Sequence, residues 1–147
     1  MGDETASVGR EWFEAWNERD FDRGAALVTA DADLVEVPTG ETFRGPEGSR
    51  EEAKKWAEAL PDGRVEVRQA IGAANAAVLE CRIRGTNTGP FATPTGDVPA
   101  TGREVDFEFC TILQIEAGKI TGVRHYYDVA TIMRQLGLMP ETAGATA

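Results

Sequence analysis

The sequence predicts an α+β domain in which a long antiparallel sheet is covered on one face by helices. Apolar residues recur at helical spacing through most of residues 4–60, whereas after Arg64 they alternate with polar residues, as in strands with one buried face. A group of helices followed by a run of strands is typical of α+β folds. A sheet that curves around helices leaves a cavity between the two layers, and such cavities are common ligand sites.

Length and charge narrow the class of protein. At 147 residues the chain has the size of one domain, and we expect residues 1–138 to form it and residues 139–147 to be a disordered tail. Fifteen basic against 25 acidic residues give a net charge of −10, which argues against nucleic acid or an anionic membrane as partner. No apolar run approaches the ~20 residues of a membrane helix, and the acidic start does not resemble a signal peptide, so we expect a cytoplasmic protein.

Three helices are predicted before Arg64. They are expected at residues 4–18, 20–30 and 46–60. The first has Val8, Trp12 and Trp16 at i, i+4 and i+8. Asp20 can cap the second, and Pro46 suits the first turn of the third.

Strands are predicted at residues 33–38, 64–71, 76–84 and 103–116. The clearest is the segment 103–116, because its apolar side chains all fall on one face: Val105, Phe107, Phe109, Leu113 and Ile115. The loop 85–102 contains three prolines, and a loop of this length in a compact domain tends to be functional.

The last segment begins after a hairpin turn at residues 116–118, runs as a strand to Asp128 and continues as a short helix. The helix has apolar residues at i, i+3, i+4 and i+7 and ends at Gly137. Asp128 stands at the junction. It can be the N-cap of the helix, or an acid at the rim of a pocket.

Two groups of motifs carry a family resemblance. One is Gly85-Thr-Asn-Thr-Gly-Pro-Phe with Pro99-Ala-Thr-Gly-Arg; the other is Gly118-Lys-Ile, a strand ending in Asp128, and Arg134-Gln-Leu-Gly. Together with the element order they resemble SnoaL-like polyketide cyclases of the nuclear transport factor 2-like, ketosteroid isomerase-related superfamily, over residues 8–138. The resemblance implies a cone-shaped (cystatin-like) fold: a curved antiparallel sheet around three N-terminal helices, with a short C-terminal helix.

The resemblance also implies site residues. The acid/base aspartate of the cyclases matches Asp128, and a tryptophan position on the same strand is Arg124 here. An acidic or histidine position of the preceding strand falls at Thr111. The base of ketosteroid isomerases falls at Val37, with Glu36 pointing the other way, and their oxyanion tyrosine at Trp12, so the isomerase mechanism is matched less well than the cyclase site.

Strand alternation places Arg124, Tyr126 and Asp128 on one face of the last strand, together with Ile120. If this face lines the pocket, Asp128 acts as the base and Arg124 or Tyr126 binds the developing oxyanion. Aromatic side chains are expected to bind the substrate: Trp12, Trp16, Trp56, Phe107 and Phe109.

The opposite face of that strand, with Val123, His125 and Tyr127, is expected to be the outer one. With Ile112 these residues would leave an apolar patch, so a homodimer through the outer sheet face is predicted, as in relatives. Because His125 is the only histidine and the two cysteines are isolated, no metal set is expected.

The function expected from the resemblance is acid/base catalysis without a cofactor: an aldol-type ring closure or an isomerisation of a small apolar or aromatic carbonyl compound. A binding protein of the same fold without turnover is the alternative. Epoxide hydrolysis ranks last, because its aspartate–arginine–aspartate set would need Asp106, which alternation places outside.

Overall fold

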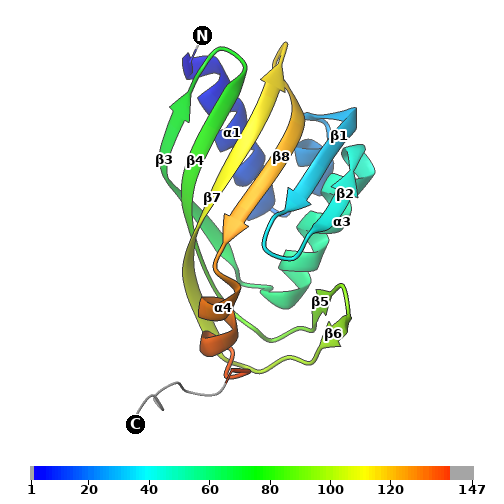
Figure 1. Cartoon of the computed structure of the whole chain (residues 1–147), viewed down its shortest axis with the longest axis vertical. Helices are drawn as coiled ribbons and strands as arrows, with labels where there is room; N and C mark the ends of the chain where they lie inside the picture. Colours follow the sequence, from blue (N-terminus) through cyan, green and yellow to red (C-terminus); the bar gives the residue numbers. More distant parts are fainter. Residues whose placement is uncertain (1, 140–147) are drawn as a thin grey trace.

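The computed structural model describes residues 2–139, which form one curved sheet with helices on its concave side (Figure 1). The four helices are α1 (Gly2–Asn17), α2 (Phe21–Ala25), α3 (Gly45–Ala59) and α4 (Val129–Gln135). The eight strands are β1 (Val28–Glu36), β2 (Glu41–Arg44), β3 (Arg64–Gly72), β4 (Ala76–Thr86), β5 (Phe91–Thr93), β6 (Gly96–Val98), β7 (Glu104–Glu116) and β8 (Lys119–Tyr127). Of the tail predicted at 139–147, only Met139 lies within the described residues.

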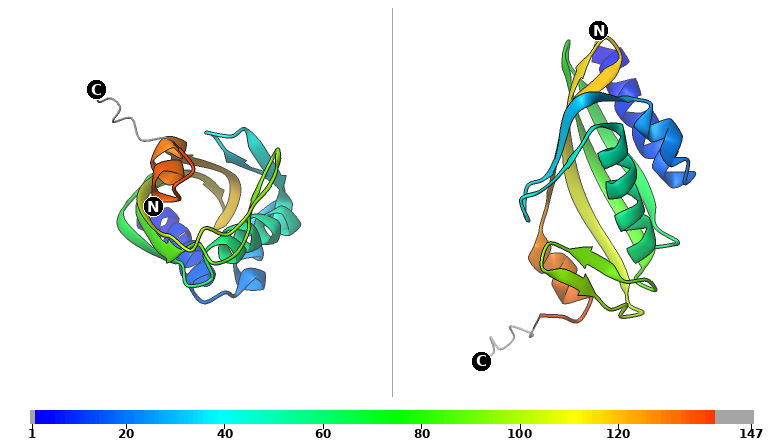
Figure 2. Two further views of the ribbon diagram at one scale, coloured as in Figure 1. Left: turned by 90° about the horizontal axis from the view of Figure 1, so that it is seen from below. Right: turned by 90° about the vertical axis from the view of Figure 1, so that its right-hand side faces the viewer.

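Six strands form the main sheet in the order β2-β1-β8-β7-β4-β3. All neighbours are antiparallel except β1 and β8, which run parallel. Seen from below, the sheet curls around α1 and α3 (left view of Figure 2). The predicted α+β fold, a curved sheet around three N-terminal helices with a short C-terminal helix, is confirmed.

Strand alternation predicted the buried face of β4 and β7 correctly. Ala77, Leu79, Cys81 and Ile83 are at most 4% exposed, and on β7 the inward residues include Leu113, which is fully buried. The turn between β7 and β8 is a tight hairpin in which Ala117 and Gly118 both have positive φ angles, of 51° and 76°. Gly137, with φ 76°, ends α4 where the sequence predicted.

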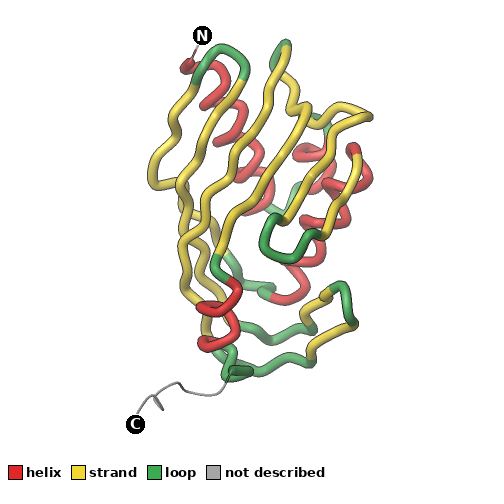
Figure 3. The backbone as a smooth tube through the Cα atoms, in the orientation of Figure 1, coloured by secondary structure: helices red, strands yellow, loops and turns green. Residues whose placement is uncertain are grey.

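Some boundaries differ from the prediction. The second helix was expected to reach residue 30, but α2 ends at Ala25 because Val28 already pairs with Ile120 of β8. Strand β2 was not predicted, and the expected loop 85–102 contains the short hairpin of β5 and β6 (green tube and yellow segments in Figure 3). In β3 an irregularity between Val67 and Gln69 turns Ile71 outward, where it is 56% exposed.

The irregularity that matters most for function lies at the start of β8. Ile115 pairs with Ile120 and Gln114 with Gly122, so Thr121 is skipped in the ladder. Ile120 and Val123 are therefore both buried, at 0% and 1% exposed, although they stand three residues apart. A bulge of this kind inverts which side chains face inward beyond it. Within residues 2–139, no helix is long and apolar enough to cross a membrane.

Candidate functional site

One pocket opens between the concave face of the sheet and the helices α1, α2 and α3. It contains about 730 Å³ of empty space, counted out to its open mouth. Its walls are mainly aromatic: Trp12, Phe13, Trp16, Phe21, Trp56, Phe107, Phe109 and Tyr127. Three carboxyl groups and one imidazole also line it, those of Asp20, Glu36, Glu52 and His125.

The structure brings together all five aromatic residues that the sequence suggested for substrate binding. Trp12 and Trp16 come from α1, Trp56 from α3, and Phe107 and Phe109 from β7. The rings contact one another around the pocket; Phe107, for example, has its ring centroid 6.4 Å from Trp56 and 6.5 Å from Phe109. A flat apolar ligand would meet ring faces and edges on several sides.

The pocket-facing placement predicted for Asp128, Arg124 and Tyr126 is wrong. Beyond the bulge at Thr121 the inward positions of β8 are Val123, His125 and Tyr127, so the predicted residues point to the outside. The prediction counted alternate residues from Ile120 and so missed the inserted residue. Arg124 is exposed and donates to the Tyr126 hydroxyl at 3.0 Å on that outer face.

Asp128 forms the N-cap of α4. Its Oδ1 accepts from the Ala130 backbone N–H at 3.0 Å and its Oδ2 from the Thr131 hydroxyl at 2.9 Å. The hydrogen bond from Thr131 is the largest of the effects that lower the pKa of Asp128. The geometry therefore supports the capping role, one of the two left open by the sequence.

The aspartate–arginine–aspartate set considered for epoxide hydrolysis lies on the outer face as well. Asp106 accepts two hydrogen bonds from the Arg82 guanidinium, at 2.7 and 2.6 Å, and Asp128 lies at the same shallow polar surface. Aromatic walls like those of the main pocket do not line this surface; Phe107 alone among its lining residues is aromatic.

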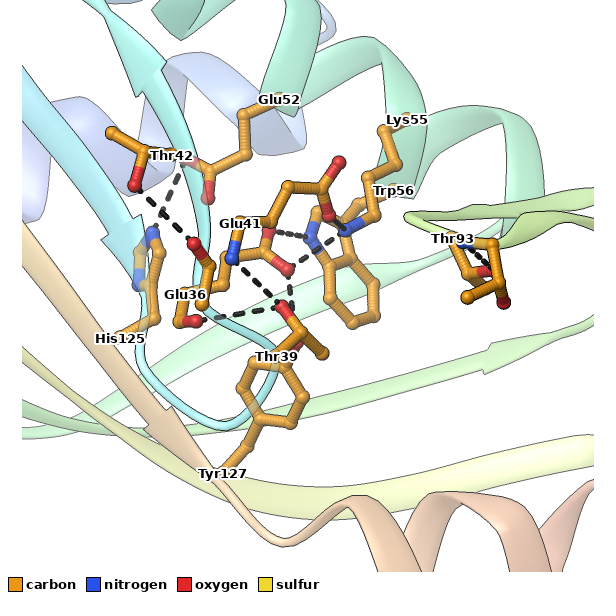
Figure 4. A network of polar contacts seen from close by, with 12 residues as sticks. Glu36, Thr39, Glu41, Thr42, Glu52, Lys55, Trp56, Thr93, His125 and Tyr127 are labelled. Atoms are coloured by element: carbon orange, nitrogen blue, oxygen red, sulfur yellow. Dashed lines mark hydrogen bonds and ion pairs between the residues drawn. The ribbon is translucent and has the colours of Figure 1, made fainter.

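Glu36 was predicted to point away from the site, but it is fully buried within it (Figure 4). Its Oε1 accepts from the Lys55 ammonium at 2.7 Å and from the Tyr127 hydroxyl at 2.8 Å, and its Oε2 accepts from the Trp56 indole N–H at 2.8 Å. Burial alone would raise the pKa of Glu36, but a hydrogen bond from Glu52, with those from Lys55 and Trp56, lowers it to about 2. Glu36 is therefore a fixed anion at neutral pH.

Glu52 and His125 form a second buried pair beside it. His125 Nε2 lies 3.3 Å from Glu52 Oε1, and His125 Nδ1 lies 2.8 Å from the Thr111 hydroxyl. Burial raises the pKa of Glu52 to about 7; His125 opposes this rise and the negative charge of Glu36 adds to it. Burial alone would lower the pKa of His125. The negative charge and the hydrogen bond of Glu52 outweigh this effect and raise the pKa of His125. Glu52 thus exchanges a proton near neutral pH while it contacts His125.

Four elements build the surroundings of this pair. Glu52 comes from α3, His125 from β8 and Thr111 from β7, and Trp12 of α1 stacks on the imidazole with ring planes 4° apart and centroids at 5.8 Å. Figure 4 shows Glu36, Glu52 and His125 turned toward one another from different elements. Thr111, placed by the resemblance at an acidic or histidine position, is instead the residue that holds the histidine.

The signal that could have revealed Glu52 is a polar stripe on α3. The buried residues of this helix include Gly48, Ser49, Glu52 and Lys55, spaced by three and four residues. A search for apolar periodicity instead selected Ala53 and the face around it. The described residues contain no group of three or more His, Cys, Asp or Glu side chains arranged to hold a metal ion.

Comparison with known proteins gives a family and a fold. Residues 6–136 match the family described as SnoaL-like polyketide cyclase. No protein with a curated description matches the sequence.

Solved structures of low sequence identity share the fold. A presumed SnoaL-like polyketide cyclase from Jannaschia sp. CCS1 has a TM-score of 0.81 at 19% identity, over 95% of this chain and 96% of its own. AclR, a presumed hydroxylase from Streptomyces galilaeus, has a TM-score of 0.79 at 18% identity, over 96% and 89%. An LEH-like epoxide hydrolase from M. tuberculosis has a TM-score of 0.70 at 18% identity, over 92% and 90%. The three proteins are described as different kinds of enzyme, although they share one fold.

Proposed function

Because the chain belongs to the SnoaL-like polyketide cyclase family, we propose that it is an acid/base enzyme that needs no cofactor and acts on a small, largely apolar carbonyl compound. The observation that carries the proposal is Glu52, a buried carboxyl whose pKa is raised to about 7 and whose Oε2 receives no hydrogen bond from the described residues. A group with a pKa near the working pH can both accept and return a proton.

The neighbouring acids and bases are less suited to this task. Glu36 is held by three donors and has a pKa of about 2, so it accepts a substrate proton poorly at neutral pH. Both ring nitrogens of His125 are already engaged, one with Glu52 and one with Thr111. Oε2 of Glu52 is the basic atom that remains.

In the proposed reaction Glu52 Oε2 removes a proton from the carbon next to the substrate carbonyl; the electron pair of that C–H bond becomes the C=C bond of an enolate, and the carbonyl π pair moves to the oxygen. In a ring closure the enolate carbon then bonds to a second carbonyl carbon of the substrate and Glu52 returns the proton to the alkoxide that forms; in an isomerisation Glu52 returns it to another carbon of the enolate. His125 holds Oε1 and stabilises the changing charge of Glu52. Ser49, one turn earlier on α3, is 4% exposed and lines the same pocket, where its hydroxyl is suited to support the carbonyl oxygen.

The aromatic walls support a substrate with a flat apolar body. Trp12, Trp16, Trp56, Phe107 and Phe109 line the same pocket as Glu52, so the pocket excludes water from the reacting atoms when a ring fills it. The low dielectric of such a filled pocket keeps the pKa of Glu52 high. This environment agrees with the carbonyl chemistry for which the family is named.

The test is exchange of the α-hydrogens of an aromatic ketone, 4-phenylbutan-2-one, for deuterium in D₂O, followed by NMR. We expect the wild-type protein to accelerate exchange, with a rate that rises as Glu52 ionises around pH 7. Glu52→Gln keeps the shape of the side chain but cannot accept the proton, so it should lower the rate roughly 10²–10⁴-fold.

Two variants serve as controls. Glu51→Gln removes the same charge from an exposed position of α3, and Asp128→Asn removes the carboxylate that the resemblance favoured; both should exchange at the wild-type rate. Loss of exchange in Asp128→Asn with full activity in Glu52→Gln would reassign the base to Asp128. A wild-type protein that binds the ketone without accelerating exchange would be a binding protein of this fold.

A further inference from the structure

The charges that line the pocket are of one sign, apart from His125. Glu36, Glu52 and Asp20 are the acidic residues of the lining, and it contains neither lysine nor arginine. The nearest ammonium group, that of Lys55, is shared between Glu36 and Glu41, at 2.7 Å from each. One cation faces two carboxylates there, so this cluster keeps a net negative charge beside Glu52.

Glu52 has a buried oxygen that still needs a donor. Glu52 is 4% exposed, its Oε1 contacts His125, and its Oε2 receives no hydrogen bond from the described residues. A buried carboxylate oxygen without a donor is costly. When Glu52 is neutral, its carboxyl proton is shared with Glu36; when Glu52 is ionised, a ligand can supply the missing donor.

The aromatic walls are chemically suited to a cation. Positive charge is attracted to the faces of tryptophan and other aromatic rings within about 6 Å. The protein already uses this contact next to the pocket, where the Lys55 ammonium lies 5.2 Å from the ring centroid of Trp56, 5.7 Å from Phe91 and 5.8 Å from Phe43. On the pocket side, Trp12, Phe107 and Phe109 contribute further ring surface around Glu52.

We propose that the pocket binds protonated organic amines, with the ammonium N–H donated to Glu52 Oε2 and the apolar body of the molecule against the aromatic walls. The inference specifies the charge of the substrate of the proposed reaction. It rests on the same pocket but not on turnover, because binding is measured without any proton transfer to carbon.

The experiment compares three probes of similar shape and different charge by isothermal titration calorimetry at pH 8: 4-phenylbutan-2-amine, 4-phenylbutan-2-ol and 2-methyl-4-phenylbutanoate. We expect the amine to bind at least ~10-fold more tightly than the alcohol, because only the amine gains a charge-assisted hydrogen bond and a cation–π contact. The carboxylate should bind most weakly, since Glu36 and Glu52 repel it. An alcohol that binds as tightly as the amine, or an amine that does not bind, would overturn the proposal.

Proton release by the wild-type protein on amine binding tests whether Glu52 is the residue that binds the ammonium group. If the amine takes the place of the proton on Glu52, binding at pH 7 should release about half a proton, given a pKa of about 7. The release appears as a dependence of the measured enthalpy on the ionisation enthalpy of the buffer. The groups that face Glu52 are Glu36 from β1 and His125 from β8, and proton uptake instead of release would mean that one of them, not Glu52, responds to the ligand.

The variants Glu52→Gln and Glu51→Gln form a matched pair. Both remove one charge from α3, but Glu52 is buried in the pocket and Glu51 is exposed. The preference for amine over alcohol should disappear in Glu52→Gln and persist in Glu51→Gln. A preference that survives in Glu52→Gln would contradict the proposal, and if this variant does not fold, the three probes and the proton release of the wild type still decide. Calorimetry tests amine binding and the ketone exchange assay tests proton transfer from carbon. A failure of one proposal can therefore be distinguished from a failure of the other.

Discussion

The single histidine and a buried glutamate on α3 determine what the pocket can do. His125 would be an ordinary core residue if its two ring nitrogens met only neutral partners, but one of them faces Glu52 and the ring is stacked on Trp12. Glu52 in turn shares its environment with the anion of Glu36, which raises its pKa further. Two carboxyls with widely separated pKa values, about 2 and about 7, are the pattern expected where one stays ionised and the other exchanges a proton.

The raised pKa of Glu52 predicts how stability depends on pH. The folded protein holds the Glu52 proton more tightly than the unfolded chain, whose ordinary value is 4.5. The corresponding stabilisation is complete below pH 4.5 and is lost as the pH rises toward 7. Glu52→Gln has no such proton to lose, so between pH 5 and 8 its free energy of unfolding should fall less than that of the wild type, by up to ~3 kcal/mol.

Urea unfolding curves at several pH values measure this difference. The Glu51→Gln variant, altered at an exposed position of the same helix, should follow the wild-type pH dependence. Identical pH profiles for wild type and Glu52→Gln would show that Glu52 has an ordinary pKa in the folded protein.

The paired strands β7 and β8 together supply the side chains of the sheet that line the site. Strand β7 supplies Phe107, Phe109 and Thr111 in strict alternation, while β8 supplies His125 and Tyr127 only because a bulge at its start shifts the alternation by one residue. Without that shift the exposed residues of β8 would lie inside. A single irregularity in the ladder thus exchanges the candidate site residues.

Phe107 and Phe109 test the packing of β7. Phe107 is 7% exposed and contacts Trp56 and Tyr127, so Phe107→Ala should lower the free energy of unfolding by about 3 kcal/mol. Phe109 is only partly buried and borders the open pocket, so Phe109→Ala should cost less. Denaturant unfolding of both variants measures this order, and a loss below ~1 kcal/mol for Phe107→Ala would contradict the orientation of the strand.

The outer face of the sheet, where the sequence predicted an apolar dimer patch, is more polar than expected. Three of the four residues cited for an apolar dimer patch, Val123, His125 and Tyr127, lie inside, and Ile112 alone remains outside. Charged pairs cross this face, among them Arg82 with Asp106 and Arg68 with Glu108.

The homodimer through this face stays a prediction. Its centre would be Ile112, which pairs with Val78 on one side and Arg124 on the other. Ile112→Lys should shift the dimer toward a monomer of about 15.8 kDa in sedimentation equilibrium, because a lysine at the centre would meet its own copy across the two-fold axis. A wild-type protein that is already monomeric at micromolar concentration would show that this face does not pair.

The sequence by itself determined the class of fold and the apolar half of the site. Periodicity located the helices and long strands, and it identified the aromatic residues because apolar side chains must leave water wherever the chain folds. The family resemblance added the curvature of the sheet. For most of these features the local pattern is sufficient, because apolar side chains at regular spacing share a buried face; Ile71, which is 56% exposed, is an exception.

Only the tertiary structure decided the polar half of the site. The local hint of the bulge at Thr121 is Gly122, since a glycine within a strand can mark a bulge, but only the observed ladder shows that His125 turns inward and Asp128 outward. Glu36 and Glu52 are ordinary surface residues by composition, and they can be buried only because Lys55, Trp56, Tyr127 and His125 arrive from other elements to bind them. The partners of Glu36 and Glu52 stand up to 91 residues apart in sequence, so no local pattern could place them together.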